Sequence, residues 1–135
     1  MGFATDLKDA TQNSPAVPKV GFVTTAKEYT DIAGRLVQAD EMDVCVRVMS
    51  VFKCHKACPL TAACAVSVAA ALEGSVVQKV MRTTNGIEAV RIGHPSGVMT
   101  MYPEVEEMEG KIEVPSVAVQ RTARRIMDGT VYVRR

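Results

Sequence analysis

Five consecutive residues, Gly93, His94, Pro95, Ser96 and Gly97, combine the residue types that a small anion-binding loop needs. The two glycines leave backbone amides accessible, the proline stiffens the middle, and the histidine and serine add side-chain donors. Such a loop can bind a carboxylate. A plain solvent-facing turn has the same composition, so the residues alone leave both interpretations open.

A second candidate anion site is the start of an apolar run at Thr61, Ala62 and Ala63. The amides in the first turn of a helix have no acceptors within the helix, and the helix dipole makes that end attractive to anions. If this start opens towards a cleft, it can hold a carboxylate or a phosphate. Taken alone, the segment favours an ordinary helix cap.

Arginine is the side chain that grips carboxylates with two parallel hydrogen bonds, and two groups of arginines are available. Arg91 stands two residues before the Gly93–Gly97 run. The other group lies near the C-terminus, where a solvated basic face opposed to the acidic residues 104–109 is the usual explanation. The sequence does not choose between Arg91 and that cluster, which consists of Arg121, Arg124, Arg125, Arg134 and Arg135.

Cysteines and a histidine cluster at Cys54, His55 and Cys58, with Cys64 further along the chain. Structural zinc sites pair two such ligand sets, and no second pair follows here. Reduced, partly buried thiols beside one surface histidine are therefore favoured over a metal site. Lys53 and His94 complete the acid/base candidates. No nucleophile–base spacing is recognisable among them, so no catalytic residue is assigned and the residues predict an anion-binding domain without a particular reaction.

The elements that must position these residues are a buried helix and a sheet. Residues 59–74 form an almost wholly apolar, alanine-rich run, which predicts a helix buried on every face. A second helix is predicted over 39–51, where apolar residues recur at helical spacing behind Asp40. Turn signals at Asn85-Gly86, Glu109-Gly110 and Asp128-Gly129 separate β-rich runs. Those runs predict strands at residues 19–24, 75–82, 87–92, 97–102, 111–119 and 130–134, and the ambiguous run 121–127 favours a strand as well.

These elements predict an α+β fold in which a curved, mostly antiparallel, barrel-like sheet wraps round a buried central helix. Residues 1–18 are expected to be a flexible lead-in and 19–135 a single domain. A net charge of +1 and six aromatic residues argue against nucleic acid as a partner. No apolar run reaches the roughly 20 residues that cross a bilayer, and residues 1–18 do not form a signal peptide, so we expect a cytoplasmic protein without a membrane partner.

Four stretches resemble one known family, the PrpF-type isomerases of aconitate, methylaconitate, methylitaconate and oxalomesaconate. Residues 90–99 (VRIGHPSGVM) resemble its RIGHPSG stretch, and 121–129 (RTARRIMDG) followed by 131–133 resemble its C-terminal strand. Residues 60–64 (LTAAC) resemble its TGAxC helix start, with Ala62 where glycine is common, and 14–20 resemble the entry to its second domain. The similarity runs in order along nearly the whole chain.

The resemblance implies half of a diaminopimelate-epimerase-like fold, with an active site in the cleft between two similar halves. It implies proton transfer without a cofactor, which moves or isomerises a C=C bond in an unsaturated tri- or dicarboxylate. The carboxylates would be bound by helix starts and by the residues that match RIGHPSG. Residues 1–3 resemble a stretch from the middle of the family, whose main lysine and cysteine acid/base candidates precede it. We therefore expect a substrate-binding half that is inactive alone and works with an N-terminal half, or a non-catalytic module that forms a homodimer.

Overall fold

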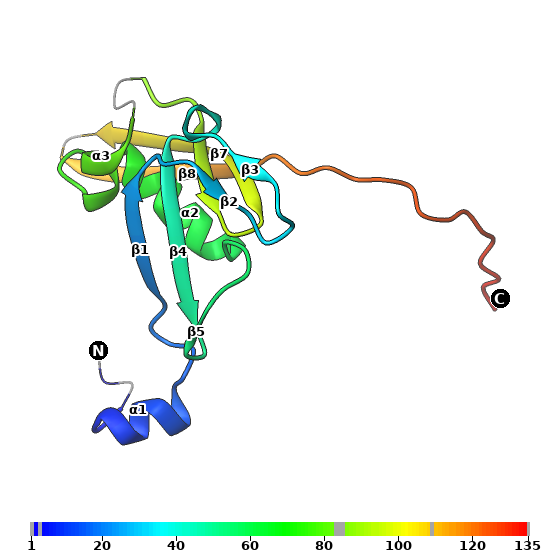
Figure 1. Ribbon diagram of the computed structural model, residues 1–135, viewed down its shortest axis with the longest axis horizontal. Coiled ribbons are helices and arrows are strands. Elements are labelled where there is room, and N and C mark those ends of the chain that lie inside the picture. Colours follow the sequence, from blue (N-terminus) through cyan, green and yellow to red (C-terminus); the bar gives the residue numbers. More distant parts are fainter. Residues whose placement is uncertain (1, 3, 83–85, 109, 135) are drawn as a thin grey trace.

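A curled half-barrel sheet packs on one central helix and forms the body of the molecule (Figure 1). The computed structural model describes residue 2 and residues 4–82, 86–108 and 110–134. The helices are α1 (Leu7–Asn13), the 3-10 turn η1 (Ala39–Glu41), α2 (Leu60–Ala71) and α3 (Val76–Val80). The strands are β1 (Val20–Thr25), β2 (Tyr29–Thr30), β3 (Leu36–Val37), β4 (Val44–Ser50), β5 (Lys53–Cys54), β6 (Val90–His94), β7 (Gly97–Met108) and β8 (Lys111–Val119).

The main sheet has the strand order β1-β4-β6-β7-β8, and β5 pairs with β4 beside this path. All pairs are antiparallel except β4 and β6, which run parallel with Val44 opposite Ile92. The helices α2 and α3 lie in the crossover between β4 and β6, because a parallel pair needs a long connection. A separate two-stranded ribbon joins β2 to β3. The α+β class and the curved sheet round a central helix are thus confirmed.

The core lies between the inner face of the sheet and α2. It is built from small and β-branched side chains that alternate along each strand, because successive residues of a strand point to opposite faces. The helix contributes Ala63, Ser67 and Ala70, and Ser67 Oγ donates 2.9 Å to the carbonyl of Cys64 within the helix. The strands contribute Val44, Val46, Val48, Val90, Ile92 and Met101, each no more than 3% exposed.

The helix predicted over 39–51 is wrong. Residues 44–50 form β4, and only 39–41 make a single 3-10 turn. Val44, Val46 and Val48 alternate into the core, and β-branched residues fit a pleated surface better than a helix. The helical spacing of Met42 and Cys45 has another cause, since these two side chains pack together beside β3 in a small second core.

Two other regions differ from their predictions. Residues 76–80 are the helix α3 and not a strand, because Ser75 caps it by accepting the amide of Gln78 at 3.0 Å. The strands predicted at 121–127 and 130–134 are also wrong, since residues 120–134 run away from the body without regular structure (Figure 1). The turn signal at Asp128-Gly129 accordingly joins no strands. The other two turn signals include Asn85 and Glu109, which lie outside the described residues. The strands β7 and β8, which flank the signal at Glu109-Gly110, pair with each other.

The strands predicted at 19–24, 87–92, 97–102 and 111–119 are confirmed as β1, β6, β7 and β8, with β7 extending further than expected. The helix predicted at 59–74 is confirmed as α2, but its burial on every face is wrong. Its Ala63–Ala70 side meets the sheet, whereas Thr61 and Ala65 are exposed. Within the expected lead-in, Asp6 caps α1 by accepting the amides of Lys8 and Asp9. No helix in the described part of the chain is long and apolar enough to cross a membrane.

Candidate functional site

The run Gly93–Gly97 is a tight connection between β6 and β7. Gly93 and His94 end β6, Gly97 begins β7, and only Pro95 and Ser96 form the turn between the paired residues His94 and Gly97. Gly97 adopts a φ of 122°, which favours glycine. A Cβ on Gly93 would lie 2.4 Å from the sulfur of Met42, so the close approach of the buried Met42 also requires glycine there.

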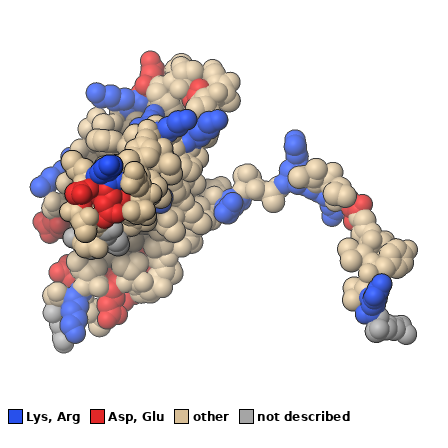
Figure 2. Space-filling model, turned by 90° about the horizontal axis from the view of Figure 1, so that it is seen from below, with Lys and Arg blue, Asp and Glu red and all other residues tan. Residues whose placement is uncertain are grey.

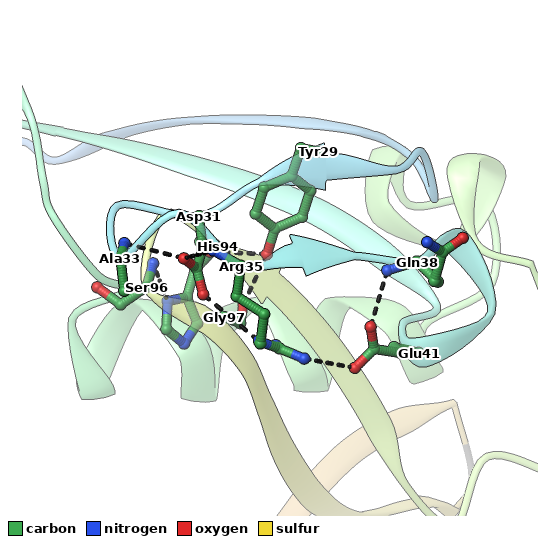
Figure 3. A network of polar contacts seen from close by, with 9 residues as sticks. All are labelled: Tyr29, Asp31, Ala33, Arg35, Gln38, Glu41, His94, Ser96 and Gly97. Carbon is green, nitrogen blue, oxygen red and sulfur yellow. Dashed lines mark hydrogen bonds and ion pairs between the residues drawn. The ribbon is translucent and has the colours of Figure 1, made fainter.

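The turn is held by Tyr29 and Arg47, which sequence reasoning did not single out. The hydroxyl of Tyr29 lies 2.7 Å from the carbonyl oxygens of both His94 and Gly97 (Figure 3). Burial raises the pKa of Tyr29, so the hydroxyl keeps the proton that it donates. Arg47 Nη1 donates to the Gly93 carbonyl at 3.2 Å, and its guanidinium stacks 4.7 Å from the centre of the Tyr29 ring.

The loop between β2 and β3 adds a second restraint on the same turn. The amide of Ile32 donates to the Pro95 carbonyl at 2.8 Å. Asp31 shapes this loop, because its carboxylate accepts the amides of Ala33 and Arg35 at 2.9 Å each (Figure 3). These hydrogen bonds, the one from the Arg35 amide foremost, lower the pKa of Asp31 and keep it ionised. The turn is therefore fixed from a segment about 60 residues earlier in the chain.

His94 is the polar side chain that this arrangement presents. It is 7% exposed, and its Nδ1 accepts the amide of Ser96 at 3.2 Å, so the proton of the neutral ring is assigned to Nε2. Burial, followed by the charges of Arg47 and His55, lowers the pKa of His94. Nε2 of His94 makes no hydrogen bond to any described residue. Among the described residues, every buried side-chain nitrogen or oxygen has a hydrogen-bond partner, so Nε2 is not buried and contacts solvent. His94 is thus a neutral N–H donor at neutral pH.

The segment before α2 lies against the turn. Ser96 Oγ donates a short hydrogen bond to the carbonyl of Lys56, four residues before α2 begins. Because an extended chain spans at most about 3.5 Å per residue, the start of α2 lies within roughly 14 Å of the Lys56 carbonyl. Pro59 occupies the N-cap position of α2. No side chain accepts a hydrogen bond from the amides in the first turn, around Thr61 and Ala62. Ala63 is already inside the helical pattern, because its amide donates to the Pro59 carbonyl at 2.9 Å.

The remaining predicted residues lie elsewhere. Arg91 forms a two-point ion pair with Asp43, with Nη2 2.6 Å and Nε 3.2 Å from the carboxylate oxygens, and it also donates to the Asp40 carbonyl. Strand alternation puts Arg91 on the opposite face of β6 from His94. Its guanidinium therefore ties β6 to the turn before β4. The described C-terminal arginines, Arg121, Arg124, Arg125 and Arg134, spread along the extended segment 120–134, away from the body (Figure 2), and Arg135 lies outside the described residues.

The side chains of the cysteine and histidine cluster have different environments. Within residues 2, 4–82, 86–108 and 110–134, no three His, Cys, Asp or Glu side chains are arranged to hold a metal ion. Cys54 is exposed and Cys58 is buried. Burial, together with the neighbouring Cys64, raises the pKa of the Cys58 thiol, which favours the protonated and unreactive form.

Comparisons with known proteins agree on one family. The profile of the PrpF protein family matches residues 1–134. A 3-methylitaconate isomerase of Eubacterium barkeri is 40% identical over 134 residues, which cover 98% of this chain and 34% of that protein. A 2-methyl-aconitate isomerase of Cupriavidus necator is 36% identical over 98% of this chain and 33% of its own length. A crystal structure of a methylitaconate delta-isomerase superposes with a TM-score of 0.73 and 33% identity, over 89% of this chain and 32% of the other. The chain therefore spans about a third of the length of these relatives.

Proposed function

Because the chain belongs to the PrpF family, we propose that it is the carboxylate-binding domain of a cofactor-independent isomerase. Its substrate would be an unsaturated tri- or dicarboxylate of the aconitate or methylitaconate type, in which a C=C bond is moved or isomerised. The names of the relatives support an isomerase of small carboxylates. The observation that carries the proposal is His94, a buried and neutral N–H donor in contact with solvent.

A neutral donor suits this reaction. When a proton leaves the carbon next to the double bond, negative charge spreads into the conjugated carboxylate. A fixed donor in a partly desolvated site stabilises that developing charge more strongly than water does. His94 supplies such a donor, and the uncapped start of α2 at Thr61 and Ala62 supplies oriented amides for a second carboxylate. Gly93, Pro95, Ser96 and Gly97 serve to hold His94, while Arg91 stabilises the strand behind it.

The rest of the site would come from a partner. We propose that the domain works with a polypeptide equivalent to the other two thirds of its relatives, that it is inactive without that polypeptide, and that it acts in the cytoplasm. The alternative is a non-catalytic module that pairs with a second copy. Two features of the edge strand β1 favour this alternative. Its apolar side chains Val20 and Phe22 are 51% and 59% exposed, and within the described sheet its outer edge has no paired strand.

The binding half of the proposal is tested by calorimetry with 2-methylaconitate and methylitaconate. We expect the folded chain to bind one of them, and His94→Gln to weaken that binding at least tenfold. Tyr132→Phe, on the exposed C-terminal segment, is the matched control and should bind as the wild type does. A folded wild type that binds neither compound contradicts the proposal.

The catalytic half of the proposal is tested by adding a polypeptide that corresponds to the part of the relatives outside the matched third. The portion of the Eubacterium barkeri enzyme outside the matched third is expressed as a separate chain and mixed with this one. Isomerisation in the mixture, and not in either chain alone, is the expected result. Ligand binding without activity in any mixture, together with a dimer in sedimentation equilibrium, favours the non-catalytic module.

A further inference from the structure

An apolar groove lies between the inner face of β1 and the exposed side of α2. Its volume is about 580 Å³, which is within the range of small-molecule sites in proteins. Its walls come from β1 and β4 on one side and from α2 and α3 on the other. The strand wall includes Val23, Val46 and Val48, and the helix wall includes Ala62, Ala65 and Ala69.

Small residues on both walls create this space. Gly21 lies on the inner face of β1, opposite Val48 of β4. A Cβ at Gly21 would meet only the Arg47 carbonyl oxygen and Val48 Cγ2, each at 3.9 Å, so a side chain fits there without a clash. On the other wall, Ala65 is an exposed position with a short side chain. The groove is therefore the volume that larger side chains at these positions would fill.

The groove offers apolar contacts and no backbone hydrogen bonds. The amides and carbonyls of a strand point towards neighbouring strands within the sheet, and those inside α2 bond to one another. A polypeptide in the groove would leave its own backbone polar groups without partners, which is costly. A strand that pairs with the free edge of β1 would lie beside the groove and not in it. An unbranched alkyl chain has no polar groups to satisfy and gains from each apolar contact.

The polar side chains of the groove lie at one end. Lys19 directly precedes β1, and Thr61 lies in the first turn of α2. Val76 of α3 lines the opposite end, because α3 packs beside the end of β1 and away from its start (Figure 1). None of the described residues that line the groove is acidic, and Lys19 forms no ion pair with any described residue. A free ammonium at one end of an apolar groove suits a ligand with a carboxylate at the end of an aliphatic chain.

We propose that this groove binds an aliphatic carboxylate, with its alkyl chain along α2 and its carboxylate beside Lys19 and Thr61. From Thr61 to Ala69 the helix advances roughly 12 Å, which sets the length of chain that the groove covers. The site goes beyond the proposed isomerase function and does not rest on it. It shares the start of α2 with that function, but its ligand needs neither a double bond nor a contact with His94.

The first test is a series of chain lengths. Butyrate, hexanoate, octanoate and decanoate are titrated into the full chain by calorimetry. We expect the affinity to rise about two- to fourfold with each added CH₂ group, because each group buries further apolar surface. Absence of decanoate binding, or an affinity that does not change with chain length, overturns the proposal.

The second test fills the groove. Gly21→Val places a strand-favouring side chain in it, and Ala65→Leu fills it from the helix side with a residue that favours a helix. We expect each folded variant to bind decanoate at least tenfold more weakly. Gly129→Val, where no atom lies within 4 Å, is the matched control and should bind as the wild type does. Decanoate binding that survives in a folded variant overturns the assignment to this groove, as does a wild-type dimer that Gly21→Val dissociates.

The third test places the carboxylate. We expect Lys19→Gln to weaken decanoate binding about threefold, since an exposed charge pair contributes little, and to leave the binding of the uncharged decanol unchanged. Lys111→Gln, at the start of β8 and outside the groove, is the matched control. Equal effects of Lys19→Gln on decanoate and decanol contradict the proposed position of the carboxylate.

Discussion

The turn at residues 93–97 and the C-terminal segment 120–134 both contain stretches that resemble the same family, yet the turn is fixed by the rest of the chain and the segment is not. The turn is bound by Tyr29, Ile32 and Arg47 and contains a histidine that is 7% exposed. In the segment, Ile126, Met127, Val131, Tyr132 and Val133 are each at least 83% exposed. The internal polar bonds of the segment are local, such as the exposed ion pair between Arg125 and Asp128.

This difference shows that a stretch of sequence becomes a site only where distant parts of the chain fix it. The carbonyls of the turn are satisfied by side chains and amides that precede it by more than 45 residues. An extended segment keeps its conformational freedom unless contacts compensate for that entropy. The turn therefore carries the site, and substitutions in the two regions should have very different consequences.

The largest expected effect is that of Gly93→Val. A Cβ at this position would lie 2.4 Å from the sulfur of Met42 and 3.4 Å from the hydroxyl of Tyr29, and both neighbours are packed. We expect a loss of about 3 kcal/mol in the free energy of unfolding, because overpacking forces the backbone to shift. Gly129→Val in the C-terminal segment, where nothing lies within 4 Å, is the matched control. Urea denaturation measures both, and equal effects would contradict the contrast between the regions.

Asp43→Ala should come next, with a loss of about 2–3 kcal/mol. The carboxylate accepts hydrogen bonds from the amide and from two guanidinium nitrogens of Arg91, and its removal leaves a partly buried amide and a partly buried charge without a partner. The control is Asp128→Ala, which removes an ion pair whose side chains are 82% and 84% exposed. Such pairs contribute close to nothing. The same thermal or urea curves decide, and a tolerated Asp43→Ala would show that Arg91 is free to bind other anions.

Tyr29→Phe should cost about 1–2 kcal/mol, because it removes the donor that faces the carbonyls of His94 and Gly97 and leaves the ring in place over Arg47. Tyr132→Phe, at 93% exposure, should change nothing. Amide hydrogen exchange at Ser96 adds a local readout, since a loosened turn should release its hydrogen bond to His94. Unchanged protection at Ser96 would show that the hydroxyl does not hold the turn.

The sequence located part of this site. Residues 93–97 were recognisable from their glycines, proline and histidine, but Tyr29 and Arg47 were not. Their contacts with the turn connect residues 46 to 68 positions apart, and no local spacing reports such a distance. Arg91 stands out by its position before the turn, whereas its partner Asp43 lies within residues 39–51, for which the sequence predicts a helix. Strand alternation, once β6 is known, places Arg91 and His94 on opposite faces.

The fold was predictable where one pattern dominated. The run 111–119 contains four β-branched residues after the turn signal at Glu109-Gly110, and it is a strand with those bounds. Residues 39–51 carried two patterns at once, and the helical spacing of Met42 and Cys45 competed with the buried valines of β4. Tertiary burial decided in favour of the strand. Residues 121–134 show the opposite failure. The run 130–134 is β-rich and the ambiguous run 121–127 favours a strand, but no partner strand in the described chain pairs with either.

A smaller effect is expected from pH. The pKa of His94 is lowered in the folded chain, chiefly by burial, so between that value and the ordinary pKa near 6.5 the unfolded chain binds more protons. Stability from this group is present above about pH 6.5 and is lost as the pH falls through the lowered pKa. Asp31, whose lowered pKa acts in the acid range below about 4, does not contribute in this window. Urea curves from pH 7 to pH 5 should show a shallower loss for His94→Gln than for wild type, and an unchanged slope would argue against a buried neutral histidine.

The smallest expected effect is that of replacing Val131 and Val133 together by serine. Both side chains are at least 84% exposed, so their removal costs no buried apolar contact, and the free energy of unfolding should stay within about 0.5 kcal/mol. Urea curves at several protein concentrations are the measurement, because they separate folding within the chain from association. A destabilisation that grows with protein concentration would mean that the segment packs against a second copy. The contrast between the two regions would then describe the isolated chain only, and the segment would have to be counted as part of an interface.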